Sequence, residues 1–368
     1  MTMLADEVDV VIGVDTHKHT HTAVATSATG GGLGEATVAT DLKGYRHLLS
    51  FARRWQGRRV WAIEGAGGYG AGLYRFLTDR GERIVELDRP GRPARRGGAK
   101  SDPIDALRAA REALSRDHQA QPRQSGPRDA LRVLLAARRS AVQASGDAQR
   151  QLHNLVVCAP EELRARLRHL GTKALVARCA RMRRPGSASI EAGSTIAAMR
   201  SLAQRIQRLE REAKDHENTT ASIVRSWRPE LLELLGVGPV VAAVILCSWS
   251  HPGRFRSEAA FANLAGVAPI PASSGLVNRH RLNRAGDRQL NRAFHTIVVT
   301  RLRLDPETQA YAARRLAEGK SMREVRRCLK RYVAREVFRL LEEHRALKPS
   351  TGDDSIAASC AGGAAAAS

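Results

Sequence analysis

Strand-like apolar runs are confined to the first third of this chain, and this confinement limits the fold more than any other feature. Two of the runs, VDVVIGVD at residues 8–15 and RVWAIE at 59–64, end in an acid. Further β-prone or helix-spaced segments follow in the order strand, strand, helix, helix, strand, at 17–27, 33–40, 42–55, 69–80 and 83–87. Strand hairpins followed by alternating strands and helices predict a mixed α/β domain over residues 1–118.

After residue 118 the pattern changes to helix alone. Two narrow apolar stripes step by three or four residues, as expected for long, charged helices of an antiparallel or intermolecular coiled coil over residues 119–225. Their members are Leu131, Leu134, Leu135, Val142, Ile196, Met199, Leu202, Ile206 and Leu209. We expect a mostly helical third domain at 226–347 and a disordered, low-complexity tail at 348–368.

The charge balance points to a polyanionic partner. The chain has 60 Lys and Arg against 37 Asp and Glu, a net charge of +23 and a pI near 11.0. Solubility alone needs a charge magnitude of only about 2–8, so nucleic acid is the favoured partner. No apolar run approaches the roughly 18 residues that would span a bilayer, and five scattered cysteines fit a reduced cytoplasm.

Four acids occupy positions where a metal site could form. Asp15 and Glu64 end strands, and Ser101 caps a helix that opens with Asp102 and Asp105, three residues apart on one face. Carboxylates packed this closely repel one another unless a cation sits among them, and hard oxygen ligands suit Mg²⁺. Alternatively, each acid is an ordinary turn, surface or helix-start charge.

Three histidines, His17, His19 and His21, alternate directly after the first predicted strand. On one strand they would share a face, as metal ligands, as phosphate contacts or simply as a solvated face. The solvated face is the more common case, because no cysteine or fixed turn spacing accompanies the histidines.

A second candidate site lies in the last third of the chain. Pro269 to Gly275 reads Pro-Ile-Pro-Ala-Ser-Ser-Gly, which places Ser273 and Ser274 on a stiff turn. A dense arginine cluster follows at Arg279, Arg281, Arg284, Arg288 and Arg292. A hydroxyl facing guanidinium groups suits attack on a phosphodiester, and the alternative is an ordinary serine turn beside a DNA-binding loop.

Two further segments of this region suit phosphate contacts. Leu235-Gly236-Val237-Gly238-Pro239 is similar to the hairpin of helix-hairpin-helix modules, whose amides bind DNA phosphate, although a simple turn between helices has the same pattern. The helix predicted over 321–345 carries Arg326 and Arg331 on a basic face beside an apolar stripe.

Taken together, these blocks resemble a known family. The segments GVDTHKHTHTAVA, AIEGAGGYG, KSDPIDALRAAR, LLGVGPVVAA and GVAPIPASSGLVNRHRLNRAGDRQLNRAFH are similar to transposases of the insertion-sequence-110 family, relatives of the pilin-gene invertase. The resemblance covers about residues 8–345. It implies an N-terminal RuvC-like domain of RNase H fold, a coiled-coil insert and a C-terminal transposase domain with a serine nucleophile.

Site roles and partners follow from the resemblance. It assigns the four acidic, Mg²⁺-binding roles to Asp15, Glu64, Asp102 and Asp105, and it places the nucleophile directly before Gly275, which favours Ser274 over Ser273. It implies donor and target DNA as substrates and a structured guide RNA from the element's ends. It also implies dimers that pair as a tetramer at synapsis, and a protein associated with the nucleoid in the bacterial cytoplasm. Rival interpretations are a RuvC-like metal-dependent nuclease or Holliday-junction resolvase, and a non-enzymatic nucleic-acid-binding scaffold.

Overall fold

The computed structural model describes residues 3–87, 101–116, 122–183, 185–186, 189–271 and 280–343. The predicted tail at 348–368, Ser273, Ser274 and Arg279 lie outside these residues. Two compact units emerge: the first contains the described residues up to 232 together with 238–255, and the second contains 233–237 together with those from 256 onward.

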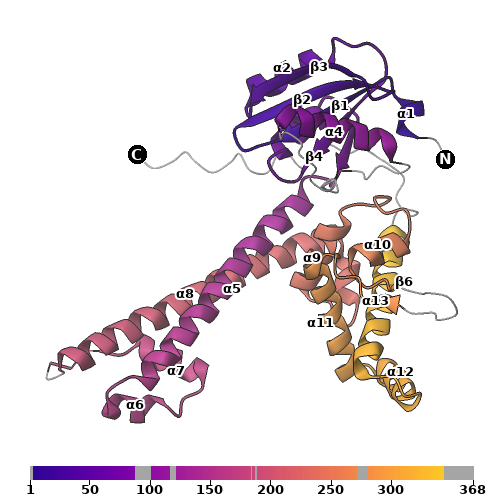
Figure 1. Ribbon diagram of the computed structural model, residues 1–368. Helices are drawn as coiled ribbons and strands as arrows, with labels where there is room; N and C mark the ends of the chain where they lie inside the picture. Colours follow the sequence, from indigo (N-terminus) through magenta and orange to yellow (C-terminus); the bar gives the residue numbers. More distant parts are fainter. Residues whose placement is uncertain are drawn as a thin grey trace, which may run out of the picture. The chain divides into compact units, whose positions relative to one another are not determined.

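A five-stranded mixed sheet organises the N-terminal part of the first unit (Figure 1). Its order is β3-β2-β1-β4-β5, where β1–β2 and β2–β3 are antiparallel while β1–β4 and β4–β5 are parallel. The strands are β1 (Val10–Thr16), β2 (Thr20–Ser27), β3 (Gly32–Ala39), β4 (Arg59–Glu64) and β5 (Ile84–Leu87). The predicted mixed α/β character of this region is confirmed.

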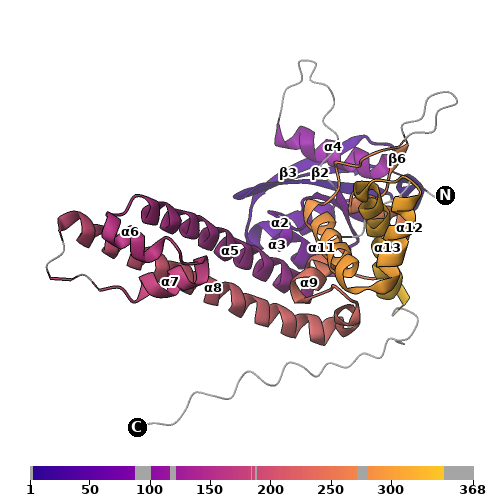
Figure 2. The same cartoon turned by 90° about the horizontal axis from the view of Figure 1, so that it is seen from below.

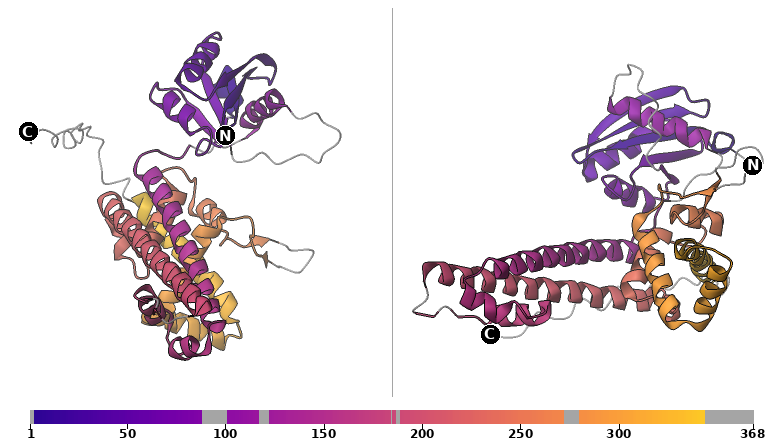
Figure 3. Two further views of the ribbon diagram at one scale, coloured as in Figure 1. Left: turned by 90° about the vertical axis from the view of Figure 1, so that its left-hand side faces the viewer. Right: turned by 60° about the horizontal axis from the view of Figure 1, so that its bottom comes forward.

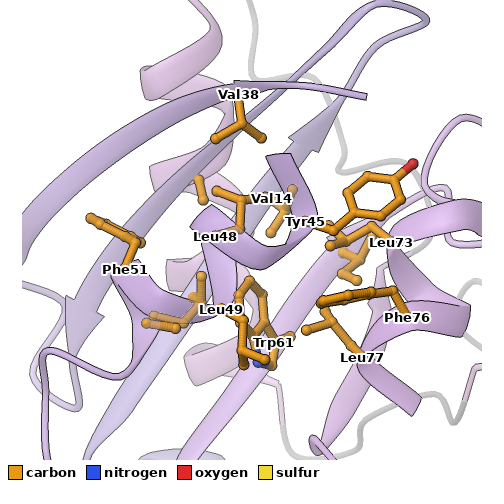
Figure 4. Close-up of a cluster of buried hydrophobic side chains, with 14 of the residues drawn as sticks. Val14, Val38, Tyr45, Leu48, Leu49, Phe51, Trp61, Leu73, Phe76 and Leu77 are labelled. Carbon is orange, nitrogen blue, oxygen red and sulfur yellow. The ribbon is translucent and has the colours of Figure 1, made fainter. Parts of the chain in front are cut away.

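Each face of the sheet is covered by helices, and strand alternation decides which residues each face receives. On one face, Ile12, Val14 and Trp61 pack under α2 (Leu42–Ala52) and α3 (Ala71–Thr78) (Figure 4). On the other, Val11 and Val60 pack against α4 (Asp102–Ser115) and the short α1 (Leu4–Glu7). Asp15 and Glu64 alternate onto this second face, next to the start of α4.

Two long helices form the rest of the first unit's framework, α5 (Pro127–Val157) and α8 (Ile190–Trp227). They lie side by side in antiparallel directions, linked through α6 (Glu161–Leu167) and α7 (Thr172–Ala180) (Figures 2 and 3). The ion pair between Arg138 and Glu217, at 2.8 Å, and the hydrogen bond from Gln149 to Glu210, at 3.1 Å, fix this direction. The apolar stripes therefore pack against each other within one chain.

The prediction that Val142 belongs to a buried stripe is wrong. Val142 is 47% exposed, and the small residues Ala141, Ser145 and Ala148 occupy the buried seam of α5 instead. Small side chains let two helix backbones approach closely, so apolar bulk is not what marks this part of the contact. Leu131, Met199 and Ile206 are buried as expected.

One helix from the range expected for the third domain, 226–347, belongs to the first unit instead. After a short 3₁₀ helix at Pro229–Glu233, α9 (Pro239–Trp249) contacts α5 and α8. Buried Arg128 near the start of α5 donates to the carbonyl oxygen of Cys247 at 3.3 Å, which ties the two helices together.

The second unit is mainly helical. It contains α10 (Glu258–Leu264), a two-stranded ribbon of β6 (Ile270–Pro271) and β7 (His280–Arg281), α11 (Arg288–Leu304), α12 (Pro306–Ala317) and α13 (Met322–Glu343). Phe261 meets Phe294 edge-to-face in its core, and Val333 and Val337 of α13 are buried. The helix predicted over 321–345 is thus confirmed, with its apolar stripe buried.

Candidate active site

Close packing of α4 on β1 brings the predicted acids together. A Cβ built at Gly13 would lie 2.1 Å from the carbonyl oxygen of Ala106 and 2.7 Å from the amide nitrogen of Ala110. Only glycine at position 13 permits this approach, and the buried face of α4 is made of alanines. The first turn of α4, with Asp102 and Asp105, therefore lies above the end of β1, where Asp15 points toward it.

Three ligand-type side chains converge there: Asp15, His17 and Asp102. The Nε2 of His17 lies 3.1 Å from Oδ2 of Asp15 and 3.5 Å from Oδ1 of Asp102. One ligand atom from each residue falls within 4.8 Å of the other two. The sequence predicts both aspartates here. For His17, together with His19 and His21, it allows a metal-ligand role but favours a solvated face for all three.

The electrostatics around Asp15 are those of a crowded anionic site. Burial raises the pKa of the Asp15 carboxyl above its ordinary value, the charges of Asp102 and Asp105 raise this pKa further, and His17 acts in the opposite direction. Asp105 lies near enough to act on Asp15 while its own carboxylate accepts a 2.7 Å hydrogen bond from Arg108. A bound cation would relieve this repulsion.

Glu64 reaches the same edge of the sheet from the neighbouring strand. Because Val14 pairs in parallel with Ile63, Glu64 follows one step further along β4, level with Asp15. The hydroxyl of Thr16 donates to the backbone carbonyl of Glu64 at 2.9 Å and fastens the two strand ends. The structure thus brings all four predicted acids to one end of the sheet, and the tightest group is Asp15, His17 and Asp102. Ser101 does precede α4 as predicted, but its side chain makes no capping hydrogen bond.

The expectation that His17, His19 and His21 share one strand face is wrong. The turn between β1 and β2 falls at residues 17–19, so only His21 lies on a strand. His21 is fully buried and stacks on Tyr45, with ring centroids 5.8 Å apart. His19 is exposed in the turn, while His17 turns toward the acids.

The two candidate nucleophiles, Ser273 and Ser274, lie outside the described residues, between β6 and β7. The base of this ribbon is tightly built. The amide of Asp287 donates to the carbonyl of Leu264 at 2.6 Å, and the side chain of Asn283 donates to that of Asn263 at 2.8 Å. The described residues that follow β7 are therefore tied to α10.

The described arginines of the second unit fall into two groups. Arg281, Arg284, Arg288, Arg292 and Arg326 are exposed, and none of them forms an ion pair within the described residues. Arg331, in contrast, is half-buried and pairs with Glu258, which also accepts a 2.8 Å hydrogen bond from Arg335. Sequence alone could not separate these groups, because Glu258 lies 73 residues before Arg331.

Carboxylates gathered at the edge of a mixed sheet, in a chain of net charge +23, are the arrangement expected of a metal-dependent enzyme that acts on nucleic acid. Two family models match the chain: a DEDD-type transposase model over residues 12–158, and the model described as "Transposase IS116/IS110/IS902 family" over residues 228–313. Both matches support an insertion-element transposase of this family, a class of enzyme that cuts and rejoins DNA.

Relatives from bacterial insertion elements agree with this assignment. The chain is 26% identical to the uncharacterized 42 kDa protein of insertion element IS900 from Mycobacterium paratuberculosis, over 92% of this chain and 97% of that protein. It is also 26% identical to the 44.8 kDa protein of IS116 from Streptomyces clavuligerus, over 84% and 88%. No helix within the described part of the chain is long and apolar enough to cross a membrane.

Proposed function

We propose that this transposase joins donor and target DNA through a covalent serine–DNA bond, with a divalent cation held by its acids and with an element-encoded RNA as guide. The observation that carries the cation part of the proposal is the convergence of Asp15, His17 and Asp102 at the end of β1. The strand order β3-β2-β1-β4-β5 supports an RNase H-like, RuvC-type assignment for this domain.

The chain's own residues fit a divalent cation. Asp15, Asp102, Asp105 and Glu64 would hold it. Burial, and then the charges of Asp102 and Asp105, raise the pKa of Asp15, as expected for a carboxyl in a crowded anionic site. Mg²⁺, when bound, would polarise phosphate oxygens and offset their charge. Arg108 neutralises part of the charge on Asp105 and orients its carboxylate. His17 fixes the relative positions of Asp15 and Asp102.

The proposed chemical step is a transesterification. The hydroxyl oxygen of Ser274 attacks a DNA phosphorus, a P–O bond to the serine forms, and the P–O bond to one deoxyribose oxygen breaks. The serine proton passes to the departing oxygen, which leaves as a hydroxyl. Because the phosphodiester count is unchanged, the reverse attack by a second strand can rejoin DNA without an external energy source. The exposed arginines from Arg281 to Arg292 would hold the phosphate.

The expected partners of this chain follow from its net charge. A chain of net charge +23 is stable in compact assemblies only when phosphate screens it, so the proposed working form is a nucleoprotein oligomer. We expect dimers that pair at synapsis and a guide RNA held by its backbone while base pairing selects the sequence. Nucleoid association in the cytoplasm follows from such binding.

A suicide DNA substrate that traps the covalent adduct tests the proposal. Ser274→Ala should lose the adduct, Ser273→Ala should keep it, and Asp102→Asn should reduce it in Mg²⁺. An undiminished adduct in Ser274→Ala would remove this serine from the mechanism. Hydrolysed ends with no adduct in the unaltered protein would favour the alternative, a RuvC-like nuclease that activates water with the four acids.

A further inference from the structure

Four polar side chains of the second unit lie near one another on two packed helices. Asn291 and His295 lie one turn apart on α11, and Arg326 and Lys330 lie one turn apart on α13. The Nζ of Lys330 donates to Oδ1 of Asn291 at 2.9 Å. His295 is close enough to both cations that, after burial, the charges of Lys330 and Arg326 lower its pKa. The cluster therefore contains side chains from both helices, and the hydrogen bond between Lys330 and Asn291 joins them.

Asn291 is held so that it presents an acceptor to Lys330. Its Nδ2 donates to the carbonyl of Ala265 at 2.8 Å and makes a longer contact with that of Gly266 at 3.4 Å. These bonds fix the amide, so Oδ1 faces the lysine. An amide oxygen orients an ammonium group without neutralising it, and two of the three lysine donors stay available.

Several carboxylates of this unit are committed elsewhere. Glu258 pairs with Arg331 and Arg335, and Glu336 pairs with Arg301. Others cap helices, with Asp287 at the start of α11, Asp305 at the start of α12 and Glu324 bonded to Ser321 before α13. Within the described residues, neither Lys330 nor Arg326 has an ion pair.

Lys330 is half-buried in this cationic setting. Burial lowers the pKa of its ammonium group, and the charge of Arg327 lowers this pKa further. A partly buried cation among other cations is unfavourable unless an anion arrives to compensate it. The hydrogen bond to Asn291 orients the ammonium group but leaves its charge uncompensated, and a bound anion would compensate it.

We propose that Lys330, Arg326 and His295, with Asn291 as the orienting group, form a binding site for one backbone phosphate of duplex DNA. The site deepens the proposed function and rests on it, since it assigns a DNA contact to this transposase. Lys330 supplies a compact point charge and Arg326 a planar guanidinium, and both can donate to the same phosphate. Exposed Arg288, Arg292 and Arg323 on the same two helices would carry the contact along neighbouring phosphates.

The test compares variants of equal charge change in the full-length chain, with fluorescence anisotropy on a labelled DNA duplex across a NaCl series. Lys330→Met should weaken binding roughly ten-fold and reduce the salt slope by about one, as for a lost phosphate contact. Lys320→Met removes the same charge from an exposed position of the same unit and should change affinity less than about two-fold.

A second pair of variants keeps the test decisive if Lys330→Met does not fold. His295→Glu places a carboxylate beside Lys330 and Arg326, so it should keep or raise the melting temperature while weakening DNA binding. Ala313→Glu adds the same charge at an exposed position on α12 and is the control. Lys330→Met and His295→Glu affinities equal to their controls would overturn the site. A loss seen with an RNA hairpin but not with duplex DNA would overturn the assignment to DNA.

These outcomes are independent of the catalytic proposal. Binding needs neither Ser274 nor the acids, so the serine mechanism can fail in the adduct assay while the phosphate site stands. Normal adduct formation together with equal binding of all four variants would leave the serine mechanism standing and would remove the phosphate site.

Discussion

Gly13 of β1 and Ala106 of α4 are in backbone contact, and this contact sets the distance between the strand that carries Asp15 and the helix that carries Asp102. No side chain fits between them, because a Cβ at residue 13 would lie 2.1 Å from the Ala106 carbonyl oxygen. The geometry of the acid cluster thus depends on the absence of one methyl group in the core.

Gly13→Ala should therefore push α4 off the sheet. We expect a loss of about 1–3 kcal/mol in the free energy of unfolding, as for overpacked cores, together with weaker cation binding. Gly32→Ala is the matched control, because a Cβ there meets nothing within 4 Å. Equal chemical denaturation midpoints for the two variants would contradict the close approach.

Asp102→Asn separates the stability of the apo protein from that of the metal-bound form. Removing one of several like charges should not lower the melting temperature in EDTA, although His17 loses a partner. In Mg²⁺ or Mn²⁺ the unaltered protein should gain stability, by about 2.7 kcal/mol at a cation concentration 100 times its Kd. The variant should lose most of that gain. Asp79→Asn, at an exposed position after α3, should keep it.

The position of the four acids at one end of the sheet could be predicted from sequence, because each lies near the end or the start of an element and adjacent element ends meet at one edge of a sheet. His17 could not be assigned in this way. Its role depends on where the hairpin turns, and alternating histidines read equally well as a continued strand. Val142 was predicted to be buried in the contact between α5 and α8, but Ala141 and Ser145 are buried there instead. These small residues allow close helix contact without contributing apolar bulk, so the apolar pattern did not reveal them.

Glu82 gives a pH-dependent contribution to stability. Hydrogen bonds from Arg59 lower the pKa of this carboxyl below its ordinary value of 4.5, at Nε–Oε2 and Nη2–Oε1 distances of 2.8 and 2.6 Å, and Trp61 adds a third donor. The folded pKa is depressed, so the contribution is fully present above pH 4.5 and is lost as pH falls through the folded pKa.

Glu82→Gln should thus cost about 1.5–3 kcal/mol at neutral pH, the range for a charged hydrogen bond. The difference from the unaltered protein should shrink as pH falls below about 4.5. Urea titrations at several pH values measure it. Glu35→Gln, at an exposed position on β3, should show no such trend. A constant difference for Glu82→Gln across pH would refute the ionic contribution.

The segment Leu235-Gly236-Val237-Gly238-Pro239 offers two glycines with opposite expectations. Gly236 has a φ of +89°, and its Cβ position lies 3.1 Å from the Ile297 carbonyl oxygen, so Gly236→Ala should destabilise the protein by about 1–2 kcal/mol. Gly238 precedes α9 with extended backbone and open space, and Gly238→Ala should be nearly neutral in thermal melts. Weaker DNA binding by Gly238→Ala at unchanged stability would support the helix-hairpin-helix interpretation.

Arg326 and Arg331 lie on the same helix but should fail in different ways. Arg326 is exposed and without an ion pair among the described residues, so Arg326→Met should lower DNA affinity roughly ten-fold at low salt and leave the melting temperature unchanged. Arg331→Met leaves Glu258 with Arg335 alone and should lower the free energy of unfolding by about 1–3 kcal/mol. Its affinity for DNA, measured well below the melting temperature, should stay close to that of the unaltered chain. Equal losses of affinity from the two variants at equal stability would mean that Arg331 leaves Glu258 to contact phosphate when nucleic acid binds.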